Sequence, residues 1–402
     1  MYDDLIRAME TAVIELDQWP SKTVFIFHHN DSDGLSSGAI LKKAFERKGY
    51  KIERYALEKP YPALLRKIYE KQGEIIVFAD FAGRIAPLLS DLNRGRNLTL
   101  ILDHHVAEPA TDPKVFNLDP TLFGLKGDRD MTGSTTCYLF ARIMNSQNSD
   151  LAPVAGIGAV GDKFFVDGRL VTQNREVVKE AVDQGMMEIR EQEVGERYFI
   201  KSSGKMMPCD ELGDYLDVLG GAGYYRNGTD MGVKVCLEGV SVESDQMVET
   251  FKAGQEKIFA DEIRQIELNG MIQTPGIQWV DVKDRFTPMG VKMIGIFCEI
   301  LVEKKLIDPD KYVAGFQTIP NHIPGFGSVE FNETKISMRV SPAMEKKIMD
   351  GKMPGLNTFL PEATGILGGF SDACHTLCGA TTIAIGRQAQ LIEEMQKILD
   401  RT

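Results

Sequence analysis

Histidine and aspartate are concentrated at a few points of this chain. Four of its six histidines stand in two adjacent pairs, in the stretches HHNDSDG and DHH, and each pair adjoins aspartate. Two further aspartates close the stretches EIIVFAD and GAVGD. Turns do not require imidazole, whereas imidazole and carboxylate together bind metal ions. The candidate ligands are His28, His29, Asp31, Asp33, Asp80, Asp103, His104, His105 and Asp162.

The types of side chain indicate which metal this site would bind. Several carboxylates with two or three imidazoles and no thiolate suit Mn²⁺ or Mg²⁺ better than Zn²⁺, with Co²⁺ as a substitute. Four clustered carboxylates repel one another unless a comparable positive charge is bound. We therefore expect two ions, about 3.5–4 Å apart, which is the usual apparatus for hydrolysing phosphoesters. A site for a single ion is the alternative.

The elements that would position these residues are strands of a parallel sheet. TVFIF, EIIVFAD and LTLILD are short apolar runs, and stretches with helical spacing separate them. Repeated alternation of strand and helix predicts a doubly wound, mostly parallel sheet with helices on its faces. Ligands of such sheets bind beyond the carboxyl ends of the strands, where the aspartates and histidines fall.

In this order and spacing, HHNDSDG, FAD, DHH and GAVGD resemble the motifs of the DHH phosphoesterase superfamily. The resemblance implies two sets of ligands that share a bridging Asp80. The implied ligands are His29, Asp31 and Asp80 for one ion, and Asp33, Asp80, His104 and Asp162 for the other.

The remaining residues of the two histidine motifs have other implied roles. His105 would face the substrate phosphate as a hydrogen-bond donor or acid, so that His105 and Asp80 are the implied catalytic residues. Asp103 would orient an imidazole. His28 has no fixed place in the pattern, and a shifted register in which His28 is the ligand stays open.

The end of the chain extends the resemblance to members with a DHH-associated domain. KISMRVS supplies Arg339, and GILGGFSDACHTLCGA supplies Gly368, Gly369 and His375. Glycine lets backbone approach a phosphate, and arginine binds two of its oxygens, so these four residues are the implied substrate-binding set. Five residues separate the glycines from the histidine here, and a plain glycine-rich turn is the alternative. CHTLC lacks the second ligand pair of a zinc site.

These patterns predict an α/β protein of three segments. We expect a catalytic DHH domain over 1–165, a helical connector over 166–272 and a smaller substrate-binding α/β domain with a mixed sheet over 273–402.

Composition excludes several classes of function. The 402 residues carry a formal net charge of −12, which disfavours a non-specific binder of duplex DNA. No apolar run reaches the roughly 20 residues of a membrane span, and the six scattered cysteines suit reduced thiols. We expect a cytoplasmic protein without a membrane partner, and a homodimer stays open.

The resemblance implies a Mn²⁺-dependent phosphodiesterase. The first hypothesis is a RecJ-like or nanoRNase-like exonuclease that releases mononucleotides from single-stranded nucleic acid or short oligonucleotides. The second is an enzyme for small nucleotides, such as a cyclic dinucleotide or 3′-phosphoadenosine 5′-phosphate. The third is a catalytically inert, replication-associated scaffold, which the complete set of implied ligands disfavours.

Overall fold

The computed structural model describes residues 2–401, and contacts divide the chain into two compact units. The first unit runs to Glu249 and includes Pro324–Phe326, and the second comprises Thr250–Ile323 and the chain from Gly327 onward. The division falls within the long helix α10 (Val242–Asn269).

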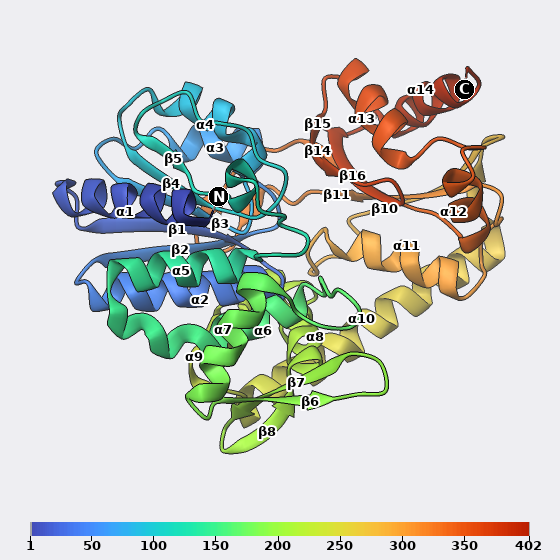
Figure 1. The fold of residues 1–402 in the computed structure, drawn as a ribbon. Helices are drawn as coiled ribbons and strands as arrows, with labels where there is room; N and C mark the ends of the chain where they lie inside the picture. Colours follow the sequence, from blue (N-terminus) through green and yellow to red (C-terminus); the bar gives the residue numbers. More distant parts are fainter. Residues whose placement is uncertain (1, 402) are drawn as a thin grey trace. The chain divides into compact units, whose positions relative to one another are not determined.

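The first unit is built on a five-stranded sheet in which every pair of neighbours is parallel, in the order β2-β1-β3-β4-β5. Helices α3 and α4 lie on one face of this sheet, and α2 and α5 lie on the other (Figure 1). The doubly wound parallel sheet is therefore confirmed. The elements are α1 (Tyr2–Gln18), β1 (Thr23–His29), α2 (Ser32–Arg47), β2 (Lys51–Leu57), α3 (Pro62–Ile68), β3 (Ile75–Ala79), α4 (Ala86–Asn93), β4 (Leu98–Leu102), β5 (Val115–Asn117), α5 (Gly133–Met144) and α6 (Ala152–Gly161).

Burial explains why the central strands form without alternation of polar and apolar residues. All five residues of β3 and all five of β4 are buried, because helices cover both faces of the sheet. The sheet is thus a rigid platform, and the loops that follow β1, β3 and β4 carry the histidine and aspartate motifs.

The segment predicted to be a helical connector is only partly helical. Its helices are α7 (Thr172–Asp183), α8 (Cys209–Gly220), α9 (Gly228–Glu238) and α10. Between α7 and α8 lies an antiparallel three-stranded sheet of β6 (Met187–Glu191), β7 (Glu196–Ser202) and β8 (Lys205–Pro208). The long helical pattern over NREVVKEAVDQGMMEIREQ was a wrong prediction, because Gly185 takes a φ of 68° and ends the helix.

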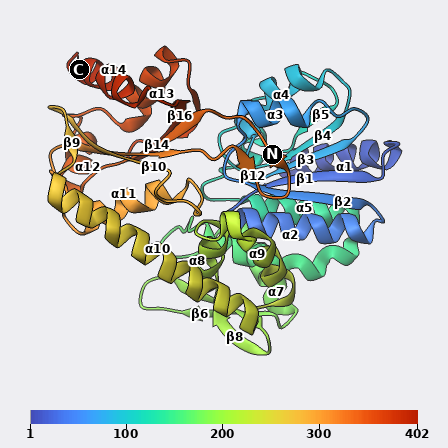
Figure 2. The same cartoon turned by 180° about the vertical axis from the view of Figure 1, so that it is seen from behind.

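The second unit contains a six-stranded mixed sheet in the order β15-β16-β14-β11-β10-β9. Only β10 and β11 are parallel, and the predicted mixed sheet is confirmed. Helix α11 lies on one side of this sheet and α13 and α14 on the other (Figures 1 and 2). The elements are β9 (Ile272–Gln273), β10 (Ile277–Lys283), α11 (Met293–Glu303), β11 (Tyr312–Thr318), β12 (His322–Ile323), β13 (Gly327–Ser328), β14 (Glu333–Arg339), α12 (Pro342–Met349), α13 (Leu356–Ile366), β15 (Phe370–Cys374), β16 (Cys378–Ala384) and α14 (Gln388–Leu399).

A short segment from late in the sequence is part of the first unit. The ring of Phe326 lies 5.3 Å from that of Tyr55 and 6.1 Å from that of Phe27, both edge-on. Lys67 Nζ lies 5.8 Å from the centre of the same ring. Aromatic and cation–π contacts of this kind fix the segment against β1 and β2.

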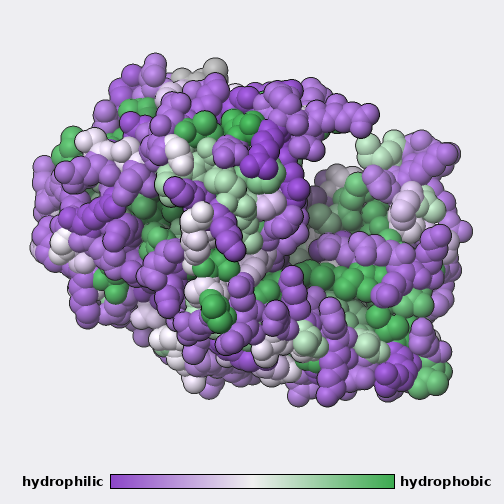
Figure 3. Space-filling view, turned by 90° about the horizontal axis from the view of Figure 1, so that it is seen from below, coloured by the Kyte–Doolittle hydropathy of each residue, from purple (hydrophilic) through white to green (hydrophobic). Residues whose placement is uncertain are grey.

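None of the helices within residues 2–401 is both long enough and apolar enough to cross a bilayer. The face seen in Figure 3 is mostly hydrophilic, with hydrophobic residues in separate patches.

A buried carboxylate attaches the three-stranded sheet to α7. Glu196 accepts hydrogen bonds from Arg175, from Arg169 at 2.7 Å and from the Tyr198 hydroxyl at 2.7 Å. Its side chain is almost fully buried, and the hydrogen bonds from Arg175 outweigh burial and lower its pKa to about 2.

We expect Glu196→Gln to lower the free energy of unfolding at pH 7 by roughly 3 kcal/mol, because it removes the buried carboxylate that pairs with Arg175. A depressed carboxyl pKa contributes stability above the unfolded-state pKa of about 4.5, and this contribution disappears as the pH falls toward 2. Denaturant unfolding at pH 7 and pH 3 measures both effects. Exposed Glu193→Gln is the control, and a deficit of equal size at both pH values would contradict this account.

Candidate metal centre

Asp31 and His29 form the first part of the site at the end of β1. Asp31 caps the N-terminus of α2, because one carboxylate oxygen accepts a hydrogen bond from the Gly34 backbone N–H at 3.1 Å. Its other oxygen lies 2.7 Å from Nδ1 of His29. The cap therefore fixes a carboxylate beside an imidazole.

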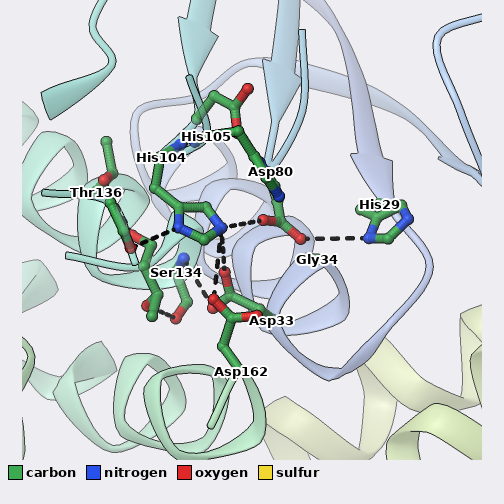
Figure 4. A network of polar contacts seen from close by, with 12 residues as sticks. His29, Asp33, Gly34, Asp80, His104, His105, Ser134, Thr136 and Asp162 are labelled. Carbon is green, nitrogen blue, oxygen red and sulfur yellow. Dashed lines mark hydrogen bonds and ion pairs between the residues drawn. The ribbon is translucent and has the colours of Figure 1, made fainter. Parts of the chain in front are cut away.

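Asp80 connects this pair to a second cluster. It follows the buried strand β3 and adopts a φ of 64°, a left-handed conformation that aspartate tolerates better than most residues. One carboxylate oxygen lies 3.6 Å from His29 Nδ1, and the other lies 3.2 Å from His104 Nε2 (Figure 4). The two oxygens thus face two different histidines.

The second cluster surrounds His104, which follows β4. Its Nδ1 is 2.9 Å from the Gly127 carbonyl oxygen, so this nitrogen donates and Nε2 is directed at the carboxylates. Nε2 lies 3.5 Å from Asp162, at the end of α6, and 4.0 Å from Asp33, in the first turn of α2. Carboxylates from three separate elements therefore converge on one imidazole.

Three polar atoms of this second cluster lack a hydrogen-bond partner among the described residues. Within residues 2–401, Asp33 Oδ2, Asp162 Oδ2 and His104 Nε2 are buried and have no aligned hydrogen-bond partner. Buried polar groups in proteins are almost always satisfied. Unpaired oxygen and imidazole nitrogen atoms that point at one another fit a bound divalent cation, and so does the set formed by His29, Asp31 and Asp80.

The pKa values of these groups show the cost of burying so many carboxylates together. Burial and repulsion from Asp80 and Asp162 raise the pKa of Asp33 well above its usual range. Burial is also the main cause that raises the pKa of Asp162 to about 6. Burial disfavours protonation of the imidazoles, but Asp31 and Asp80 outweigh it and raise the pKa of His29 to about 10.

The same balance of forces acts on His104. Burial opposes its protonation, but Asp162, Asp80 and Asp33 raise the pKa of His104 well above its usual value. The buried carboxylates therefore require positive charge nearby, which either protonated imidazoles or bound metal ions can provide.

His105 has a different environment from His104. Its side chain is 44 % exposed, and its Nδ1 lies 2.7 Å from an oxygen of buried Asp103. The same oxygen accepts a hydrogen bond from the His104 backbone N–H at 2.8 Å. Asp103 thus holds Nδ1 of His105 in a fixed hydrogen bond, and the catalytic role implied for His105 stays a prediction.

His28 lies on the opposite face of β1 from His29. It is fully buried against Gly38 of α2, its Nε2 is 2.6 Å from the Arg54 guanidinium, and its Nδ1 is 2.7 Å from the His29 carbonyl oxygen. Burial and Arg54 lower the pKa of His28 to about 3, so it accepts from Arg54 and donates to His29. His28 joins none of the ligand groups found in residues 2–401.

The N-terminus of α5 belongs to the site, and sequence reasoning missed it. The Ser134 backbone N–H donates to Asp33 at 3.0 Å. A side-chain Cβ at Gly133 would lie 2.7 Å from an oxygen of Asp80 and 2.8 Å from one of Asp33. The stretch MTGSTT, with Thr132 as helix cap, is a helix-start signal that could have placed an N-terminus here.

The implied substrate-binding residues all lie in the second unit. Arg339 is the last residue of β14 and pairs with Cys378 of β16. The next residue of β16, Gly379, pairs with Cys374 at the end of β15. His375 follows Cys374 directly, so Arg339 and His375 lie at the same end of the sheet. Nε of Arg339 is 2.6 Å from Glu299.

The two glycines lie at the other end of that sheet. Gly368 and Gly369 precede Phe370, which pairs with Thr382, and Thr382 pairs with Lys335 near the start of β14. Strand pairing therefore places Arg339 and His375 at one end of the sheet and the glycines at the other. CHTLC forms the turn between β15 and β16, and neither of its cysteines belongs to a ligand group within residues 2–401.

Comparison with known proteins gives one relative by sequence. No protein-family profile matches the chain. An uncharacterized protein, MJ0831 of Methanocaldococcus jannaschii, is 31 % identical over 165 residues, which are 39 % of this chain and 36 % of that protein. The chain thus matches about a third of the length of this relative.

Solved structures resemble the chain over almost its whole length. RecJ of Thermus thermophilus in complex with Mn²⁺ has a TM-score of 0.64 at 13 % identity, covering 98 % of this chain and 55 % of that one. A DHH domain described as a member of the s1p family of ribosomal proteins has a TM-score of 0.61 at 15 % identity, covering 98 % and 91 %. CDC45 of Entamoeba histolytica has a TM-score of 0.56 at 11 % identity, covering 99 % and 98 %. The chain therefore has the fold of these RecJ and DHH-domain structures, and the resemblance predicted from the sequence is confirmed at the level of the fold.

We expect Gly133→Ala to destabilise the protein by roughly 2 kcal/mol, because the new methyl group would push against two buried carboxylates. Gly365→Ala is the matched control, since a Cβ there meets nothing within 4 Å and lies in α13. Denaturant unfolding of both variants measures the difference. Equal stability of the two variants would show that the carboxylates are not packed as described.

Proposed function

We propose that the protein is a metal-dependent phosphodiesterase that holds two divalent ions, most simply Mn²⁺, on either side of Asp80. The observation that carries this proposal is the placement of the two Asp80 oxygens, one toward His29 and one toward His104. Asp80 belongs to one ligand group with His29 and Asp31 and to another that includes His104. His104 in turn forms a group with Asp33 and Asp162, so we propose two ligand sets that share Asp80.

The chain's own residues would divide the work as follows. His29, Asp31 and Asp80 would hold one ion, and Asp33, Asp80, His104 and Asp162 the other. A pair of bound ions supplies a water of lowered pKa and positive charge for the phosphoryl oxygens. His105, oriented by Asp103 and exposed, would donate a hydrogen bond or a proton to the phosphate.

Single-stranded nucleic acid or a short oligonucleotide is the proposed substrate, with mononucleotides as the product. The structural likeness to RecJ supports it. The net charge of −12 favours few phosphate contacts, which keeps small nucleotides, such as a cyclic dinucleotide or 3′-phosphoadenosine 5′-phosphate, as the second candidate.

Arg339 and His375 are proposed to bind a phosphate of the substrate. They lie at one end of the second unit's sheet, and Arg339 is largely buried and held by Glu299. A guanidinium fixed in this way retains donors for phosphate oxygens at little further loss of side-chain entropy. Gly368 and Gly369, at the other end of the sheet, would not share that phosphate.

A catalytically inert scaffold is the alternative of another class, and the likeness to CDC45 is the observation that favours it. The orphaned donor atoms of Asp33, His104 and Asp162 argue against it, because a scaffold has no use for an unsatisfied buried site.

We expect Asp80→Asn to abolish hydrolysis, because it removes the charge shared by both ligand groups. The measurement is Mn²⁺-supplemented digestion of single strands labelled at the 5′ or 3′ end, beside cyclic dinucleotides and bis(p-nitrophenyl) phosphate. Exposed Asp91→Asn is the control. Residual activity of Asp80→Asn above a tenth of wild type would refute the bridging role, and an inert wild-type protein that binds no Mn²⁺ would favour the scaffold.

Metal binding should release protons, because coordination requires neutral imidazole. The raised pKa values of His29, about 10, and of His104 keep both rings protonated at pH 7 in the metal-free protein. We therefore expect Mn²⁺ affinity to rise with pH and more than one proton to leave per chain. Calorimetric titration in buffers of different ionisation enthalpy counts these protons, and a count of zero at pH 7 would contradict the ligand assignment.

A further inference from the structure

The loop between β1 and α2, which carries the proposed ligands Asp31 and Asp33, is held by a helix from a later part of the chain. That helix is α8, which begins at Cys209 and ends at Gly220. The sequence predicted this region only as a connector. The loop and α8 both belong to the first unit, so the contacts between them are made within one compact body.

Two hydrogen bonds join α8 to this loop. The Ser32 backbone N–H donates to Asp217 Oδ1 at 2.9 Å. The side-chain amide of Asn30, which is fully buried, donates from Nδ2 to the Gly220 carbonyl oxygen at 2.8 Å. Asn30 and Ser32 are the two chain neighbours of Asp31, so α8 holds the loop on both sides of this proposed ligand.

Glycines bring α8 close to two segments of the metal centre. A Cβ at Gly220 would lie 1.6 Å from the Asn30 carbonyl oxygen, and one at Gly213 would lie 3.1 Å from the Gly161 Cα. Gly161 is the last residue of α6 and directly precedes the proposed ligand Asp162. Helix α8 therefore packs backbone against backbone on the loop and on the end of α6.

The bond to Asp217 satisfies a requirement of helix α2. The first N–H groups of an α-helix have no acceptor within the helix itself. One oxygen of Asp31 accepts from the Gly34 N–H, and the other lies beside His29. Asp217 provides the acceptor for the Ser32 N–H from a different helix, which leaves the second Asp31 oxygen directed at His29 and the proposed ion.

We propose that Asp217 is a positioning residue of the metal centre. By accepting the Ser32 N–H, it fixes the loop from which Asp31 contributes to one ligand set and Asp33 to the other. The inference rests on the proposed function for these two ligand sets, whereas the hydrogen bond itself exists without metal. The metal centre thus depends on α8, which lies beyond residue 165 in the chain.

Mn²⁺ titration of full-length variants tests the positioning role. Asp217 is half-buried, and Asp217→Ala removes the acceptor without adding bulk. We expect its Mn²⁺ affinity to fall roughly tenfold or more, as when other groups that orient metal ligands are removed. Asp217→Asn retains Oδ1 as an acceptor and should bind Mn²⁺ within about threefold of wild type. An Asn variant as weak as the Ala variant, or an Ala variant as tight as wild type, would overturn the proposal.

Hydrogen exchange in the metal-free protein separates failure of this inference from failure of the proposed phosphodiesterase function. The Gly34 N–H reports on the loop, because Asp31 accepts its hydrogen bond. In Asp217→Ala, the amides of Ser32 and Gly34 should exchange roughly tenfold faster than in wild type or Asp217→Asn. Unchanged exchange at Gly34 would show that the geometry of the loop does not depend on Asp217, whether or not the protein hydrolyses phosphodiesters.

Tyr215→Phe is the matched control, because it removes a hydrogen bond of the same helix away from the loop. The Tyr215 hydroxyl donates to Ser244 Oγ, near the start of α10, at 2.7 Å. This variant should keep the Mn²⁺ affinity and the Gly34 exchange rate of wild type. If it lowers affinity and protection as much as Asp217→Ala does, Asp217 stabilises α8 in general and does not position the loop.

Discussion

The structure depends on one electrostatic constraint: Asp33, Asp80 and Asp162 are gathered around His104 with little water to screen their charges. Burial and mutual repulsion raise the pKa values of Asp33 and Asp162. The attraction of the carboxylates for a proton raises the pKa of the adjacent His104 in spite of its burial. Only positive charge makes the arrangement stable. Asp80 is the centre of the constraint because one of its oxygens lies 3.6 Å from His29 and the other 3.2 Å from His104. The proposal of two ions follows from this charge balance.

The fold satisfies that constraint through backbone geometry. Parallel strands deliver His29, Asp80 and His104 to one edge of the sheet, and the left-handed backbone at Asp80 turns its carboxylate between the histidines. Helix N-termini and small residues line the other side of the carboxylate cluster. Asp33 lies in the first turn of α2, and Gly133 at the start of α5 approaches so closely that no side chain fits. The favourable field of two helix N-termini offsets part of the repulsion among the carboxylates.

The sequence predicted the parallel sheet and the strand-end clusters well, because apolar runs followed by Asp and His are local patterns. In the sequence, only the family resemblance favoured His29 over His28 as the metal ligand. Alternation along a strand places neighbouring side chains on opposite faces, but it does not say which face carries the site. The residues that packing brings to the site were not predictable from the sequence. Gly133 and Ser134 stand in the first turn of α5, and their sequence reads as an ordinary helix start. The sheet β6–β8 was missed because MEIREQ fits helical and strand spacing about equally. The separation of Gly368 and Gly369 from His375 depends on strand pairing that no motif contains.

The central claim is that Asp80 lies between two metal ions. Anomalous diffraction from crystals grown with Mn²⁺ measures this most directly. The account predicts two anomalous peaks, one in contact with His29 and Asp31 and one in contact with Asp33, His104 and Asp162, with an Asp80 oxygen at each. A single peak, or two peaks of which neither contacts Asp80, would contradict it.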